Sequence, residues 1–179
     1  DKAYNEDFSY SKRLTVADYT TSKSRYGGQG VQISQAHFNP DDGYNRLLII
    51  FDDGDMIQAK TESADSLKDD GLYVTRSFAR LAGIKVGGFL NVTPYQDGHT
   101  YKFEVKGIVT SETNQGAYLH ARVFEKAGGD FTPHTLLVGP EVDEDTIKQD
   151  KGVLSVIEKG SQEKNAYDFV SSLMSVFLM

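Results

Sequence analysis

Residues 100–110, which read TYKFEVKGIVT, alternate between apolar and polar side chains over most of their length. The two alternating sets are Tyr101, Phe103 and Val105, and Lys102, Glu104 and Lys106. A period of two places the sets on opposite faces of a β-strand, so the segment is predicted to be a strand with one buried face. The strand-like segment 89–93 precedes it across the turn-forming residues YQDGH, which favours a local hairpin.

Short segments of similar character recur along the chain. They are predicted to be the strands 8–17, 31–38, 46–51, 56–61, 72–75, 116–119, 134–139 and 153–159. The second and third of these flank NPDDGYN, whose proline, aspartates and glycine favour a turn. Segment 19–30 is polar and contains glycine, so it is predicted to be a loop or an irregular excursion.

Helices are predicted to be short and less numerous than strands. They are 77–82, 121–127, part of the acidic run 141–150, and a closing helix capped by Ser161 with Ala166, Phe169, Val170, Leu173 and Phe177 on one side. In the first helix Phe78, Leu81 and Ala82 share a face, and Thr75 or Ser77 is the expected cap. The predicted fold class is therefore α+β, with a mixed, mostly antiparallel sheet and short helices.

Composition excludes several classes of function. The 179 residues suit one domain, and a net charge of -7 with a pI near 5.0 argues against nucleic acid or anionic lipid as a partner. The chain has no cysteine, which excludes thiolate zinc sites, cysteine nucleophiles and disulfides.

The glycines of SFARLAGIKVGGFLNV, residues 77–92, raise the question of a phosphate-binding loop. In a dinucleotide fingerprint the glycines lie between a strand and the amino end of a helix. Here Gly83, Gly87 and Gly88 follow a helix and precede a strand, so the helix presents its carboxyl end, which has the wrong partial charge for phosphate. The stretch is interpreted as a corner, with Gly83 as a left-handed helix cap.

No motif marks an active site or a metal site. The four histidines lack metal-ligand spacing, and no serine lies in a G-x-S-x-G elbow. Acidic residues bracket the predicted strand pair 31–38 and 46–51 and could supply oxygen ligands to a calcium ion, although the EF-hand spacing is absent. They are Asp41, Asp42, Asp52, Asp53 and Asp55. We therefore expect no catalytic residue, no cofactor-binding residue, no metal ligand and no cofactor.

Two longer stretches carry a resemblance to a known family. They are GLYVTRSFARLAGIKVGGFLNV, residues 71–92, and YKFEVKGIVTSETNQGAYLHARVFEKAG, residues 101–128. The predicted elements come in a fixed order: a strand, a short helix, a glycine turn, two strands, and a further strand that leads into a short helix. This order resembles that of the extracytoplasmic domains of FtsX-like ABC transporter permeases, a group of domains that includes the MacB-like periplasmic core domain. The match covers roughly residues 71–139. At Gly88 the family usually has Asp, which loosens the match at a structural position.

The resemblance implies a fold of the MacB-like periplasmic-core type and a non-enzymatic role. In this family the ATPase is a separate cytoplasmic subunit, and the outer domain engages a substrate or a partner protein. Residues 1–179 would be one extracytoplasmic domain of a longer membrane protein, with a variable β subdomain around 31–61. Residues 8–17 would arrive from a membrane helix and 166–179 would lead into the next. The expected location is the outer face of a bacterial cell membrane, in a Gram-positive cell.

Two other function classes remain open. One is a surface adhesion or carbohydrate-binding module that uses aromatic side chains, for which the candidates are Tyr19, Tyr26, Tyr44 and Tyr95. The other is a hydrolase with a pair of carboxylates, because the separation of two acids in space cannot be read from their spacing in the chain.

Overall fold

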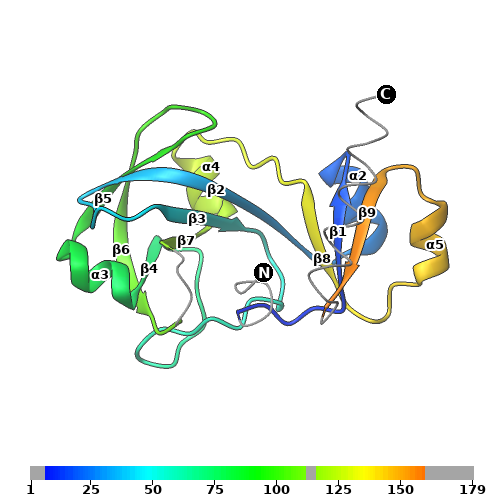
Figure 1. Ribbon diagram of the computed structural model, residues 1–179, viewed down its shortest axis with the longest axis horizontal. Helices are drawn as coiled ribbons and strands as arrows, with labels where there is room; N and C mark the ends of the chain where they lie inside the picture. The colour runs from blue at the N-terminus through cyan, green and yellow to red at the C-terminus, as the bar shows by residue number, and fades with distance from the viewer. Residues whose placement is uncertain (1–6, 112–115, 160–179) are drawn as a thin grey trace.

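The computed structural model describes residues 7–111 and 116–159 (Figure 1). The strands in this part of the chain are β1 Lys12–Val16, β2 Gln29–Asn39, β3 Arg46–Phe51, β4 Leu72–Thr75, β5 Phe89–Pro94, β6 Tyr101–Val109, β7 Ala117–His120, β8 Thr135–Val138 and β9 Val153–Glu158. The helices are α2 Tyr19–Tyr26, α3 Arg76–Ala82, α4 Ala121–Lys126 and α5 Glu144–Gln149.

Six strands close into a barrel. Their order around the ring is β3, β7, β4, β6, β5 and β2, and β2 pairs again with β3. The β3–β7 and β4–β6 pairs are parallel, whereas the other pairs of the ring are antiparallel. The predicted α+β class with a mixed, mostly antiparallel sheet is confirmed.

The barrel interior is the main hydrophobic core. In β6 the predicted alternation is confirmed, because Tyr101, Phe103 and Val105 are buried between more exposed neighbours. The rings of Phe38 in β2 and Phe78 in α3 meet edge to face with centroids 5.1 Å apart. Burying apolar area of this kind is the principal stabilising contribution to such a fold.

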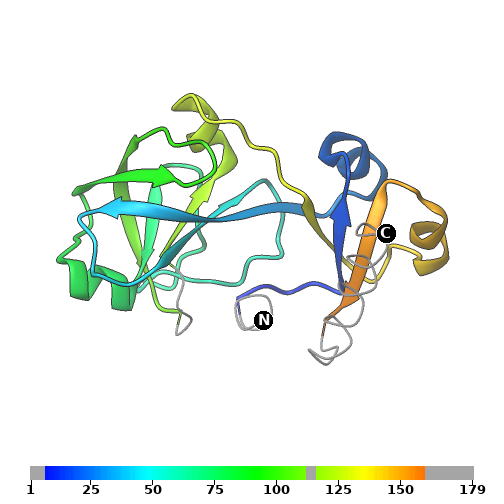
Figure 2. The same cartoon turned by 45° about the horizontal axis from the view of Figure 1, so that its top comes forward.

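The same nine-stranded sheet continues beyond the barrel from one end of β2. The first residues of β2 pair with β8, and the order continues through β1 to β9. We call β8, β1 and β9, with α2 and α5, the outer sheet. Its core consists of Leu14, Val16, Leu136, Val138, Val142 and Ile147. Figure 2 shows the long β2 running from the barrel to the outer sheet, so one strand belongs to both parts.

The prediction for residues 19–30 is wrong, because α2 occupies Tyr19–Tyr26. Asp18 caps this helix by accepting a hydrogen bond from the Thr21 amide, 3.3 Å away. Ser22 is the buried residue within it. A helix without an apolar stripe produces no 3.6-residue pattern, and capping with tertiary contacts stabilises it instead.

Three smaller predictions also need correction. Residues 56–61 form isolated bridges and not a strand. Leu81 is 53% exposed, whereas Phe78 and Ala79 are the buried residues of α3. Thr75 is the N-cap residue of α3 by position, but its side chain accepts no capping hydrogen bond from a helix amide; its hydroxyl donates to the Gly116 carbonyl, 3.4 Å away. The predicted closing helix lies outside the described residues.

Gly83 adopts the predicted left-handed conformation, with φ 71° and ψ 31°. No heavy atom lies within 4 Å of a Cβ built there, so a side chain is disfavoured by the backbone alone. Gly83→Val is expected to lower the free energy of unfolding by about 1–2 kcal/mol, measured by urea denaturation. Gly83→Asn is the matched control, because asparagine tolerates this region, and equal losses in the two variants would contradict the explanation.

Candidate functional site

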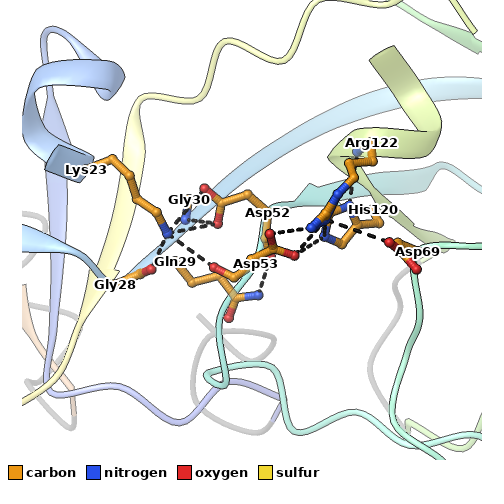
Figure 3. Close-up of polar contacts among 9 residues, drawn as sticks. All are labelled: Lys23, Gly28, Gln29, Gly30, Asp52, Asp53, Asp69, His120 and Arg122. Atoms are coloured by element: carbon orange, nitrogen blue, oxygen red, sulfur yellow. Dashed lines mark hydrogen bonds and ion pairs between the residues drawn. The ribbon is translucent and has the colours of Figure 1, made fainter. Parts of the chain in front are cut away.

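A network of charged side chains lies where the barrel meets the outer sheet (Figure 3). Because β3 and β7 are parallel, their carboxyl ends lie at the same edge, with Phe51 opposite His120 in the register. The chain therefore places the aspartates that follow β3 beside the residues that end β7 and begin α4. We call the following set the polar junction: Lys23, Gln29, Asp52, Asp53, His120 and Arg122.

Asp53 joins the β3 end to the start of α4. Its carboxylate accepts hydrogen bonds from both terminal nitrogens of Arg122, at 2.8 and 2.5 Å. The Nε2 atom of His120 is 3.0 Å from Asp53 Oδ1, and His120 Nδ1 accepts from the Arg122 amide at 3.0 Å. Nε2 of His120 therefore lies between the Asp53 carboxylate and the Nη1 atom of Arg122, which is 3.3 Å away. The Arg122 guanidinium also lies 3.7 Å from Asp69.

Asp52 joins the same end of β3 to β2 and α2. Its Oδ1 accepts from the Gly30 amide at 2.8 Å, and the Lys23 ammonium lies 3.4 Å from each carboxylate oxygen. Lys23 also donates to the backbone carbonyls of Gly28 and Asp53. Asp52 Oδ2 is buried and accepts no hydrogen bond from any residue in the described ranges.

Burial changes the acidity of both partners. The pKa of Asp52 is raised from 3.8 to about 7, chiefly by burial; the Gly30 amide opposes this increase and the neighbouring Asp53 charge contributes to it. Burial also lowers the pKa of Lys23, although the Asp53 charge opposes this. Asp52 therefore changes its protonation state near neutral pH.

Gln29 fixes the loop that follows β3. Its side chain is buried, donates to the Asp52 carbonyl at 2.8 Å and accepts from the Met56 amide at 2.9 Å. Gln29 is also the first residue of β2 and pairs with Leu137 of β8. The loop is thus attached to the strand that both parts of the molecule share.

The structure does not gather the acidic cluster considered for calcium. Asp41 and Asp42 lie in the turn between β2 and β3, whereas residues 52–55 follow the opposite end of β3. Six strand residues separate the two groups, a distance of about 20 Å at 3.3 Å per residue. Asp42 is instead buried against Arg46. Within residues 7–111 and 116–159, no group of three or more His, Asp or Glu side chains is arranged to hold a metal ion.

The four candidate tyrosines lie in different surroundings. Tyr19 packs edge to face against Phe131, and the Tyr26 hydroxyl donates to Asp150. Tyr44 and Tyr95 are 68% and 59% exposed, in the β2–β3 and β5–β6 turns respectively. Tyr19 and Tyr26 of α2 therefore make contacts within the protein, whereas Tyr44 and Tyr95 are exposed on separate turns of the barrel.

Sequence reasoning did not identify the polar junction. It grouped Asp52 and Asp53 with a hairpin, gave His120 no particular role and left Lys23 in a predicted loop. The available signal was the position of polar residues directly after two apolar strands. Using that signal requires knowing that β3 and β7 are parallel neighbours, although 65 residues separate Phe51 from Ala117.

No family model and no curated protein sequence matches the chain. Its structure is similar to that of the periplasmic region of MacB from Actinobacillus actinomycetemcomitans, with a TM-score of 0.45 and 10% sequence identity. The similarity covers 82% of this chain and 87% of that one. No helix among the described residues is long and apolar enough to cross a membrane.

Proposed function

We propose that this chain is a non-catalytic extracytoplasmic domain of an ABC transporter permease. In this role it binds a substrate or a partner protein and couples that binding to ATP hydrolysis by a cytoplasmic subunit. The observation that carries the proposal is the family-like order of elements between residues 71 and 139. These elements are β4, α3, the Gly83 corner, β5, β6, β7 and α4.

The arrangement of the outer sheet supports a domain inserted into a longer membrane protein. Its strands β1 and β9 are the first and last strands of the described chain, and they pair so that Lys12 lies opposite Glu158. The two ends of the described fold are therefore adjacent, a geometry that is compatible with insertion between two membrane helices. The proposed location is the outer face of a bacterial membrane.

The polar junction suits a coupling role. Lys23 belongs to the outer sheet and Arg122 to the barrel, and the consecutive residues Asp52 and Asp53 connect them. A displacement of the outer sheet by attached membrane helices would reach the barrel through β2 and this network. Coupling of this kind needs contacts that differ between two states, and a charged network at a shared strand can supply them.

The reading frame that encodes this chain provides the first test. We expect it to encode membrane-spanning helices on both sides of the domain, and the purified protein to carry an ATP-binding subunit. A reading frame without flanking membrane helices would overturn the proposal.

The second test measures motion in the assembled permease. These 179 residues have no cysteine, so once any cysteine in the rest of the permease is replaced, a pair of spin labels can be attached at Glu125→Cys in α4 and Lys148→Cys in α5. We expect the distance between these labels to change with ATP, while a pair within the barrel, Glu125→Cys and Asn91→Cys, does not change. Arg122→Ala should reduce the response. An unchanged α4 to α5 distance would contradict coupling through the junction.

A further inference from the structure

The inward face of β2 changes character along the strand. Ala36 and Phe38 belong to the barrel core, but Ser34 and Gln32, on the same face by the period of two, are polar. Beside them is an open cavity of about 360 Å³, lined on its other sides by residues of the β5–β6 turn, α4 and the segment that follows α4. We call it the barrel-mouth cavity. Mouths of β-barrels are common places for ligand sites, and the volume lies in the usual range for them.

Ser34 is the least expected residue in this lining. It is only 6% exposed, and its hydroxyl has no hydrogen-bond partner among the residues that the structure describes. Gln32 differs, because its side-chain oxygen accepts from the Thr132 amide at 2.7 Å. A buried hydroxyl without a partner is uncommon in folded proteins and calls for an explanation.

The charge of the lining is negative. Asp97 and Asp130 contribute carboxylates, and no lysine or arginine is among the described residues that line the cavity. Asp97 is held in place by the Tyr101 hydroxyl and the His99 amide, each 2.9 Å from one of its oxygens. This lining repels carboxylate and phosphate groups and attracts cations.

Two aromatic residues also contribute to the lining of the cavity. The rings of Tyr101 and Phe124 both line it, with centroids 5.1 Å apart and planes inclined at 57°. Aromatic faces attract ammonium and guanidinium groups, and Asp97 and Asp130 add charge-assisted hydrogen-bond acceptors. The lining therefore suits a planar or tetrahedral organic cation.

We propose that the barrel-mouth cavity binds a guanidinium or ammonium group, either of a free small amine or of a basic side chain in a peptide. The cation would pair with Asp97 and Asp130, contact the Tyr101 ring, and donate a hydrogen bond to the Ser34 hydroxyl. The inference goes beyond the permease assignment and does not depend on it, because it rests on the cavity alone.

The test measures the binding of three probes to the 179-residue chain by isothermal titration calorimetry. The probes are agmatine, the capped tripeptide Gly-Arg-Gly, and the citrulline analogue of that tripeptide. Citrulline keeps the shape of arginine without the charge. We expect a cationic probe to bind at least about tenfold more tightly than the citrulline peptide, and binding to weaken with added salt. Tighter binding of agmatine indicates a free amine, and tighter binding of the tripeptide indicates a peptide. Failure of both cationic probes to bind overturns the proposal.

Variants then locate the site. Asp130→Asn should weaken binding of the better probe about tenfold, and Ser34→Ala about three- to tenfold. Asp145→Asn in α5 is the control, since it makes the same charge change at an exposed position on the outer sheet. Melting temperatures establish that all variants are folded. If Ser34→Ala and Asp130→Asn both bind as the parent does, the cation is not bound in this cavity.

Discussion

Arg46→Ala is expected to lower the free energy of unfolding by about 3–5 kcal/mol, because it leaves a buried carboxylate without its partner. The Arg46 and Asp42 side chains are 6% and 0% exposed. Nε and Nη2 of Arg46 donate to one oxygen of Asp42 at 3.0 and 2.6 Å, and the Tyr44 amide donates to the other at 3.1 Å. The guanidinium also lies over the Phe78 ring, 5.5 Å from its centroid.

Urea denaturation measures this loss, and two further variants interpret it. Arg46→Lys keeps the charge but loses the planar fork, so we expect a smaller loss than for alanine. Lys148→Ala removes the exposed ion pair with Glu144 and should cost less than about 0.5 kcal/mol. If Arg46→Ala costs no more than Lys148→Ala, burial of the pair does not have the effect described.

The stability of the protein is expected to fall between about pH 4 and pH 7 because of Asp52. The pKa of this carboxyl is raised from 3.8 to about 7 by burial, so the folded state holds a proton that the unfolded state has released. The stabilisation that protonated Asp52 contributes is fully present below pH 4, decreases as the pH rises and is lost above pH 7. The difference in pKa sets an upper limit of about 4 kcal/mol on this stabilisation, and solvent access to the junction reduces it to about half.

Asp52→Asn isolates this effect, because the amide does not titrate. The free energy of unfolding of the variant minus that of the parent should increase steadily from pH 4 to pH 7, as followed by denaturation at a series of pH values. The other carboxyl groups cancel in this difference. Asp145→Asn, at an exposed position of α5 outside the polar junction, is the matched control. Parallel pH profiles for Asp52→Asn and the parent would contradict a raised pKa at Asp52.

Local patterns predicted the elements that are defined by neighbours in the chain. The alternation in residues 101–106 predicted the buried face of β6, and the helix followed by Gly83 predicted a corner with positive φ. Both depend on side-chain periodicity or on the backbone freedom of glycine, which are properties of a few consecutive residues. The same stretch supported the family resemblance. The α2 helix was missed because its capping by Asp18 and its contacts with the outer sheet leave no periodic pattern.

The α+β class, most strands, the Gly83 corner and the absence of cysteine chemistry could be predicted from the amino-acid sequence, because they follow from local pattern and composition. The contact of Asp53 with Arg122, the burial of Asp52 beside Lys23 and the position of Ser34 at a cavity became visible only in three dimensions. Each of those contacts depends on closure of the barrel and on the parallel β3–β7 pair. The pairing of strands far apart in the chain is decided by the packing of the whole domain, so no short segment encodes it.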